Sequence, residues 1–245
     1  YLVPNYNFNI LLVDDGSKDN TLSIIRELSK NDKNVKYLAF AKNFGKEAAM
    51  LAGLRLASQL DSDAVLIMDA DLQHPPKLIP EMIKAYEAGC QHVYGRQKSR
   101  KKEPFLKTIF AKFFYKFFAM LTGNHNLNDG SGDFCLIDRH VVQALLDIKD
   151  YKRFTKGIFT WIGFEKKRIE YDYVPRAQGQ TKWTIKKLYR YAMLGIKQFS
   201  HIYLLVSTLF LLVSFGFLGF DIYQWITKGF SFSELKIDLF IIMVA

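Results

Sequence analysis

The first hundred residues alternate between short apolar runs and stretches with helical spacing. Apolar runs of four to eight residues are typical of strands, and they occur here at Phe8–Asp15, Val35–Phe40 and Ala64–Met68. The shorter segment His92–Tyr94 is interpreted as a further strand. Between them, apolar residues recur three or four positions apart, which predicts helices at Asn20–Leu28, Gly45–Gln59 and Pro80–Ala88. This alternation predicts an α/β domain with a mostly parallel sheet covered by helices. Ligands of such sheets bind at the carboxyl ends of the strands.

The C-terminal part of the chain is much more apolar. Ile202–Phe220 contains no charged residue over nineteen positions, a helix of about 28 Å against a hydrocarbon core of about 30 Å. We therefore predict a first transmembrane helix at residues 201–226. A second apolar run, Leu239–Ala245, predicts the start of a truncated second transmembrane helix at residues 238–245.

Two segments before the predicted membrane helix mix basic and aromatic residues. Pro104–Leu121 carries Lys107, Lys112 and Lys116 among many Phe, Ile and Leu residues, and Thr181–Ser200 has the same character. Basic, aromatic-rich helices of this kind are typical of the membrane interface. We expect interfacial helices at about 104–121 and at 181–200. Ordinary amphipathic helices that pack on the domain are the alternative.

The charge of the chain requires an anionic partner. Lys and Arg number 34 against 24 Asp and Glu, a formal net charge of +10, which suits nucleic acid, lipid head groups or a phosphorylated substrate. The basic residues are interleaved with apolar anchors, so we expect a lipid bilayer and no nucleic acid. Two lysines face three acids between the apolar runs, so the basic region is expected on the cytoplasmic side. Cys90 and Cys135 form neither a disulfide framework nor a metal motif, which favours a reducing compartment.

Two carboxylates follow the third predicted strand. Asp69 and Asp71 are separated by one residue, and such a pair can bind one hard divalent cation through oxygen. Gln73 can supply a third oxygen. A cation held there can bridge the oxygens of a diphosphate and neutralise a leaving group. A solvated acidic turn is the alternative.

Acidic residues also end the first predicted strand. Asp14 and Asp15 can accept hydrogen bonds from a base or a ribose, and Gly16 permits a tight turn. Residues Lys42–Lys46, at the start of the next predicted helix, offer cations and helix N–H groups to phosphate. A capped turn and a solvated loop are the respective alternatives.

Several motifs in fixed order carry a family resemblance. They are VDDGSKDNT, AKNFGKEAAMLAGL, MDADLQHPP, GDFCLIDR, FTKGIFTWIGF and RAQGQTKW. Together they resemble the polyisoprenyl-phosphate glycosyltransferases of glycosyltransferase family 2, which include bactoprenol glucosyltransferases and dolichol-phosphate mannose synthases. The resemblance implies a GT-A fold, here residues 1–180, followed by interfacial and transmembrane helices.

The resemblance also implies four groups of site residues. The nucleotide is expected to contact Pro4, Tyr6, Asp14, Lys46 and Asp69. The cofactor, Mg²⁺ or Mn²⁺, is expected to be bound by Asp69, Asp71 and Gln73. The acceptor phosphate is expected to contact Arg96, Arg100, Arg176 and Lys182. The catalytic position near the acceptor is Asp133, whereas His74, Cys135 and His140 are expected to be structural.

The start of the chain departs from the family pattern. The family has a strand and a PxYN motif, which Pro4–Asn7 resembles, and then a whole helix before the VDDGS strand. Two parallel strands need a crossover of about a dozen residues, yet only Pro4–Phe8 separates them here. A segment near Asn7 is therefore either deleted from the protein itself or absent only from the sequence as printed. The second is favoured because every downstream motif is intact.

The reaction implied by the resemblance is inverting transfer of a sugar from a nucleotide sugar to a polyisoprenyl phosphate. A phosphate monoester is mostly dianionic at pH 7, so the acceptor needs little deprotonation. We therefore expect Asp133 to position the acceptor or to screen its cationic surroundings. UDP-glucose and undecaprenyl phosphate are the expected substrates, with UDP-N-acetylglucosamine and GDP-mannose as alternative donors.

Two other classes of protein are alternatives. A processive polysaccharide synthase should show a QxxRW signature, but Gly179 stands four residues before Trp183, in place of the Gln, and Lys182 replaces the Arg. A non-catalytic membrane scaffold with a decayed site is the other alternative. The expected protein is an integral membrane enzyme of a bacterial inner or plasma membrane with its catalytic domain in the cytoplasm. A homo-oligomer is compatible with the sequence.

Overall fold

The computed structural model describes most of the 245-residue chain. The described residues are 6–98, 116, 118–120, 133–150, 152–172 and 185–229. The chain divides into two compact units, Tyr1–Gly195 and Ile196–Ala245, which are taken separately below.

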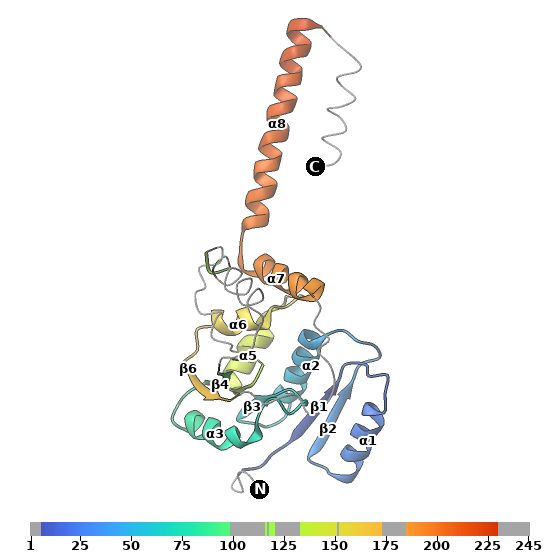
Figure 1. Ribbon diagram of the computed structural model, residues 1–245, viewed down its shortest axis with the longest axis vertical. Helices are drawn as coiled ribbons and strands as arrows, with labels where there is room; N and C mark the ends of the chain where they lie inside the picture. Colours follow the sequence, from blue (N-terminus) through green and yellow to red (C-terminus); the bar gives the residue numbers. More distant parts are fainter. Residues whose placement is uncertain are drawn as a thin grey trace. The chain divides into compact units, whose positions relative to one another are not determined.

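The first unit begins with a small parallel sheet. Strands β1 (Ile10–Asp14) and β2 (Val35–Ala39) pair in parallel, and α1 (Thr21–Asn31) connects them (Figure 1). Helix α2 (Lys46–Ser58) packs against β1, and a Cβ added at Gly53 would lie 3.2 Å from Val13 Cγ2. The predicted strands and helices of this region are confirmed.

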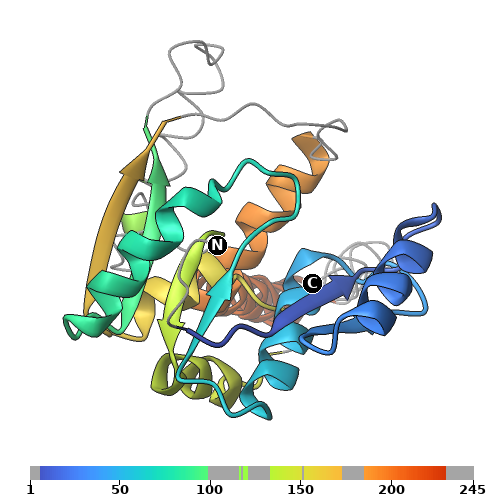
Figure 2. The same ribbon diagram turned by 90° about the horizontal axis from the view of Figure 1, so that it is seen from below.

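The second sheet has four strands in the order β3, β5, β4, β6. They are β3 (Ala64–Ile67), β5 (Cys135–Asp138), β4 (His92–Gln97) and β6 (Lys166–Tyr171). Strands β4 and β6 are parallel, but β5 runs antiparallel to both of its neighbours. Figure 2 shows β4 and β6 side by side, on the opposite side of this unit from β1 and β2.

The expectation of a mostly parallel sheet is therefore wrong, and the sheets are mixed. The strand responsible is β5, which comes from the GDFCLIDR motif and was not predicted as a strand. Its apolar residues Cys135, Leu136 and Ile137 are buried between β3 and β4. The antiparallel direction places the start of β5 beside the carboxyl end of β3.

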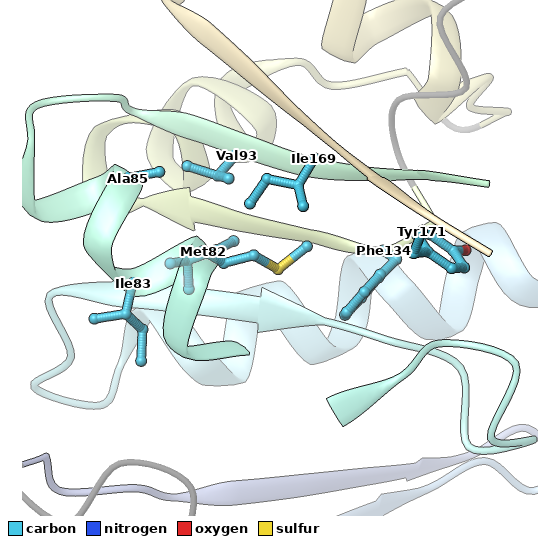
Figure 3. Close-up of a cluster of buried hydrophobic side chains, with 8 residues drawn as sticks. Met82, Ile83, Ala85, Val93, Phe134, Ile169 and Tyr171 are labelled. Atoms are coloured by element: carbon cyan, nitrogen blue, oxygen red, sulfur yellow. The ribbon is translucent and has the colours of Figure 1, made fainter. Parts of the chain in front are cut away.

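Helix α3 covers part of this second sheet. The 3-10 helix η1 (Pro76–Leu78) leads into α3 (Ile79–Glu87), which corresponds to the helix predicted at Pro80–Ala88. The buried cluster in Figure 3 joins α3 to the sheet through Met82, Ile83, Ala85, Val93, Phe134, Leu136, Ile169 and Tyr171. Each large apolar side chain buried this fully stabilises the fold by about 1.5–3 kcal/mol.

Two further helices follow β5. They are α5 (Arg139–Asp147), capped by the Asp138 carboxylate at the His140 N–H, and α6 (Thr155–Trp161). The buried Arg153 joins them, because its guanidinium donates hydrogen bonds to the Leu145 carbonyl at 2.8 Å and the Ile148 carbonyl at 2.6 Å. The start of α6 is thereby tied to the end of α5.

Two of the predicted C-terminal helices are present in the structure. Helix α7 (Ile185–Phe199) corresponds to the predicted helix at 181–200, and its place at a membrane interface stays a prediction. Helix α8 (Ile202–Lys228) contains the 24-residue segment Leu204–Thr227, with a mean hydropathy of 2.0 and none of it buried. Within the described part of the chain, α8 is the one helix long and apolar enough to cross a membrane.

The other C-terminal predictions lie largely outside the described residues. This applies to the predicted membrane segment at 238–245 and to most of the predicted interfacial helix at 104–121. In the latter, Lys116 and residues 118–120 are described, and they are helical.

His92 on β4 is a buried polar side chain in an apolar place. It is fully buried between Tyr94 and Phe159, and neither ring nitrogen has a hydrogen-bond partner among the described residues. Burial, with a smaller effect from Lys166, lowers the pKa of His92 to about 3. An unfolded histidine binds a proton near pH 6.5, so the unfolded state holds more protons between these two values. The stability of the fold should therefore fall by about 1.4 kcal/mol per unit as the pH drops below 6.5.

We expect His92→Leu to remove this pH dependence and to leave the fold at neutral pH intact or more stable. The leucine keeps the volume and leaves no polar atom unpaired. The measurement is the thermal unfolding midpoint of the detergent-solubilised chain from pH 7 to pH 4. His140→Gln, at a largely exposed histidine, is the control. A His92→Leu variant that loses stability with falling pH as steeply as the parent contradicts the assignment.

Candidate active site

Four charged side chains from four segments meet in one ion-pair cluster. Lys46 Nζ, at the start of α2, lies 2.8 and 2.9 Å from the two carboxylate oxygens of Asp69 and 3.0 Å from Asp133 Oδ1. The other oxygen of Asp133 lies 2.7 Å from Lys156 Nζ on α6. Their side chains are between 31% and 41% exposed, so the cluster is open to solvent. We call these four residues the lysine–aspartate cluster.

The pairing of β3 with β5 explains why the two carboxylates meet. Ile67 lies opposite Cys135 in this antiparallel register. Continuing the register by two residues brings Asp69 opposite Asp133, although 64 positions separate them in the sequence. Phe134, next to Asp133, is buried over Gly95, where an added Cβ would come within 2.5 Å of its ring. A side chain at Gly95 would therefore displace Phe134 and disturb the site.

The two lysines keep the Asp133 carboxylate ionised. Burial alone would raise the pKa of Asp133, but Lys156 and Lys46 outweigh burial and hold that pKa well below its usual range. Burial would likewise lower the pKa of Lys46, but Asp133 and Asp69 outweigh it, and the pKa is raised. A carboxylate this acidic is a poor proton acceptor near pH 7. This suits the expected role of Asp133 in positioning or charge screening.

His74 supports the backbone of Asp69. The Asp69 N–H donates a hydrogen bond to His74 Nδ1 at 2.9 Å, and the imidazole stacks on Phe134 with ring centroids 4.9 Å apart. Burial lowers the pKa of His74, which favours the neutral ring that this hydrogen bond needs. His74 therefore positions the loop after β3, as a structural residue.

The loop that holds the second carboxylate is tightly folded. Leu72 has a φ of +61°, in the left-handed region that L-residues other than Asn and Asp rarely adopt, and it is exposed. The Gln73 N–H donates to Asp71 Oδ1 at 3.1 Å. Backbone strain of this kind is concentrated at functional sites and needs support from the surrounding structure.

The acidic residues of this loop fit a divalent cation that arrives with a diphosphate. No group of three or more His, Cys, Asp or Glu residues is placed to hold a metal in the described part of the chain. Mg²⁺, however, is usually bound by one or two carboxylates, with phosphate oxygens and water completing the shell. Asp69 and Asp71 match that requirement. Because both oxygens of Asp69 contact Lys46, a cation ligated by Asp69 would share this carboxylate with Lys46.

The turn after β1 is packed against the segment before α2. Asp14 is buried, and both of its carboxylate oxygens accept from the Ser17 N–H at 3.2–3.3 Å. Gly16 has a φ of +68°, and a Cβ there would lie 2.5 Å from the Lys42 carbonyl carbon. Only glycine fits both the conformation and the space at this position.

The expected phosphate contacts at the start of α2 are altered by Asp15. Its carboxylate oxygens accept from the N–H groups of Phe44 at 2.7 Å and Gly45 at 2.9 Å. Lys42 lies over the ring of Phe44, 5.1 Å from its centroid. Two N–H groups that the sequence suggested for phosphate are therefore already bound within the chain, and Lys46 is the residue of this segment that reaches the cluster.

The remaining predicted site residues are placed as follows. The Tyr6 hydroxyl hydrogen-bonds Glu87 at the end of α3, and Arg96 lies on β4 opposite Glu170 of β6. Pro4, Arg100, Arg176 and Lys182 lie outside the described residues. Among the predicted residues that are described, the structure brings Lys46, Asp69 and Asp133 into direct contact.

Lys156 was not identified from the sequence. It stands in the FTKGIFTWIGF motif, which contributed to the resemblance but received no role. The signal was a lysine in a motif otherwise rich in apolar residues. Its contact with Asp133 depends on the packing of α6, which the local pattern does not reveal.

The sequence matches a family model and several named relatives. The model described as glycosyl transferase family 2 matches residues 2–146. CsbB of Bacillus subtilis is 42% identical over 197 residues, covering 80% of this chain and 58% of that protein. The uncharacterized glycosyltransferase sll0501 of Synechocystis is 38% identical over 226 residues, or 91% of this chain and 70% of the relative. The bactoprenol glucosyl transferase of Shigella phage SfV is 37% identical over 195 residues, or 80% of this chain and 62% of the relative.

Solved structures support the fold. The glucosyl-3-phosphoglycerate synthase of Mycobacterium tuberculosis, crystallised with Mn²⁺ and UDP, has a TM-score of 0.55 at 14% identity. The match covers 78% of this chain and 67% of that one. At this identity the likeness concerns the fold alone, which is GT-A-like with mixed sheets. The family model, which spans more than half of the chain, and the named relatives together show that this protein is a glycosyltransferase of family 2.

Proposed function

We propose that this protein transfers a sugar, with inversion, from a nucleotide sugar to a polyisoprenyl phosphate at the cytoplasmic face of a membrane. UDP-glucose is the proposed donor and undecaprenyl phosphate the proposed acceptor. The observation that carries the proposal is the lysine–aspartate cluster, in which the predicted catalytic Asp133 is joined through Lys46 to the predicted donor-site Asp69. The 37% identity to a bactoprenol glucosyl transferase supports the acceptor class.

The donor would lie along the carboxyl ends of β1 and β3. Tyr6 and Asp14, with Pro4, are proposed for the nucleoside. Asp69, Asp71 and Gln73 are proposed to hold Mg²⁺ or Mn²⁺, which supplies positive charge to the departing diphosphate. Lys46 brings a second positive charge to the same place, because its ammonium group already bridges Asp69 and Asp133. A fixed cation at the site where negative charge develops is the most effective form of electrostatic stabilisation.

The acceptor would approach on the side of Asp133 and Lys156. One oxygen of its phosphate forms the new bond to the anomeric carbon while the bond from that carbon to the diphosphate breaks on the opposite face. No proton needs to be removed from a dianionic phosphate, in agreement with the low pKa of Asp133. Lys156 would attract the phosphate, and Arg96, Arg100, Arg176 and Lys182 are proposed to guide it from the bilayer surface.

The lipid acceptor requires the active site to be near a bilayer. Helix α8 is long and apolar enough to span one, and we propose that it anchors the protein as an integral membrane enzyme. Helix α7 would then lie at the interface, as its basic and aromatic sequence predicts. The residues at 104–121 and 238–245 would contribute a second interfacial helix and a second membrane helix.

The test is sugar transfer by the purified full chain in detergent or nanodiscs. Undecaprenyl phosphate is supplied with labelled UDP-glucose, UDP-N-acetylglucosamine or GDP-mannose, and the label that enters the organic phase is measured. We expect UDP-glucose to give the highest rate and chelation of divalent cations to abolish it. An Asp133→Asn preparation controls for contaminating activity. Absence of a labelled lipid with all three donors would exclude the proposed reaction.

A further inference from the structure

Glu47 directly follows Lys46 in α2, yet its contacts lie outside the lysine–aspartate cluster. One carboxylate oxygen accepts hydrogen bonds from the Thr155 hydroxyl and from the Thr155 N–H, the latter at 3.3 Å. The other oxygen accepts from the Tyr191 hydroxyl at 2.8 Å. Thr155 is buried, and Glu47 is half-buried. A single carboxylate therefore joins α2 to the first residue of α6 and to Tyr191 in the middle of α7.

The contact with α6 completes the start of that helix. Thr155 is the first residue of α6, and the preceding Phe154 supplies no side-chain cap. The first N–H groups of a helix have no partner within it, and a negative charge beside them is favourable. Glu47 thus caps α6 from a residue more than a hundred positions earlier. Glu47 also stabilises the charge of the buried Arg153. Burial lowers the pKa of Arg153, and the negative charge of Glu47 opposes that change.

The contact with α7 is fixed by close packing. The ring of Tyr191 lies against that of Phe154, with centroids 4.8 Å apart. A Cβ added at Gly195 would lie 3.0 Å from the Phe154 ring and 3.2 Å from Phe118, so a side chain there has no room. The Tyr191 hydroxyl therefore reaches Glu47 from a part of α7 that is packed against Phe154 and Phe118.

The residues next to Glu47 and Thr155 in the sequence are the two lysines that contact Asp133. Lys46 precedes Glu47 on α2, and Lys156 follows Thr155 on α6. The Glu47–Thr155 contact joins the first turn of α2 to the first turn of α6. The ammonium groups of Lys46 and Lys156 then contact different oxygens of Asp133. We propose that Glu47 is a positioning residue that sets the spacing of Lys46 and Lys156 around Asp133, and that Tyr191 links this spacing to α7. The expected change in turnover rests on the proposed function, whereas the expected change in the placement of Lys46 and Lys156 does not.

The expected result is a loss of turnover with little loss of donor binding. Because a misplacement of about 1 Å can cost about 100-fold in rate, we expect Glu47→Ala to approach that loss. Glu47→Gln should lose less turnover than Glu47→Ala, since its amide oxygen can still accept a hydrogen bond from either Tyr191 or Thr155. The other contact is lost, because the amide nitrogen cannot accept a hydrogen bond. Donor affinity, measured by calorimetry, should change by less than about threefold. Lys46 keeps its charge and its neighbour Asp69 in the variant, and its exact placement matters most where charge develops in the transition state. Glu81→Ala, at an exposed glutamate in the first turn of α3, is the matched control.

A double-mutant cycle separates positioning from general destabilisation. Thr155→Val keeps the shape of the side chain and removes its hydroxyl. If Glu47 acts through Thr155, the double variant should lose clearly less turnover than the product of the fold-losses measured for Glu47→Ala and for Thr155→Val alone. Multiplicative losses contradict the proposal. The Glu47→Gln and Thr155→Val variants carry the test if Glu47→Ala does not fold.

A second readout does not depend on any transferase activity. The two lysines are labelled with an amine-specific acylating reagent at pH 8, and labelling at each position is followed by mass spectrometry. Lys46 and Lys156 should react severalfold faster in the Glu47 variants than in the parent chain, and equally in Glu81→Ala. Unchanged labelling of both lysines overturns the positioning role even where the protein transfers sugar. Faster labelling in a protein that transfers no sugar supports the positioning role and rejects only the proposed function.

Discussion

Changing Asp133 to asparagine is expected to lower the turnover of sugar transfer by about 100- to 1000-fold. The carboxylate contacts Lys46 with one oxygen and Lys156 with the other. An asparagine amide offers one oxygen and one NH₂ group, and the NH₂ group cannot accept from an ammonium ion. One lysine would lose its contact with this side chain, and the positive charges near the acceptor would be less well balanced and less firmly held. Turnover at saturating donor and acceptor measures the effect, and the thermal midpoint verifies that the variant folds.

The pH profile distinguishes this role from general-base catalysis. Lys156 and Lys46 hold the pKa of Asp133 well below its usual range, so the group stays ionised from pH 5 to pH 8. We expect kcat/KM of the parent to rise with pH through about 6, as the acceptor phosphate loses its second proton. The Asp133→Asn variant should show the same rise at a lower rate. If that rise disappears in the variant, Asp133 itself titrates there and acts as the base.

The local pattern of the sequence was sufficient for the N-terminal half of the fold. Strands β1 to β4 and helices α1 to α3 follow from apolar runs and helical spacing, because each signal lies within about ten residues. Strand β5 (Cys135–Asp138) did not follow, because it lies beyond the alternation of strands and helices in the first hundred residues. Its antiparallel direction depends on pairing with β3 and β4, which are distant in the sequence.

The same distinction applies to the site. The motifs identified Asp69 and Asp133 individually, but their meeting depends on the register between Ile67 and Cys135. Glu47 and Lys156 were missed for a similar reason, since the motifs that contain them assign no chemical role to either residue. Their importance comes from contacts between helices that only the folded chain forms.

The second large effect is expected at Asp71, in the loop after β3. Asp71→Asn replaces one hard anionic oxygen donor by a neutral amide in an otherwise unchanged loop, where the Gln73 N–H can still donate to the remaining oxygen. A divalent cation supplies several kcal/mol of stabilisation to developing charge, which corresponds to about 100-fold or more in rate. We therefore expect turnover to fall by about that factor at ordinary Mg²⁺ concentrations.

The concentration of metal required for activity tests the reason for this loss. If Asp71 is a ligand, the variant should need much more Mg²⁺ or Mn²⁺ for half-maximal turnover, and high metal should restore part of the activity. Asp61→Asn is the matched control, because Asp61 precedes β3 at its opposite end and is fully exposed. It should change neither turnover nor the metal requirement. A variant at Asp71 that keeps the parent metal requirement, whatever its turnover, shows that Asp71 does not bind the cation. A cation near the diphosphate would then be held by Asp69 as the carboxylate ligand of that loop, with the ammonium group of Lys46 beside it.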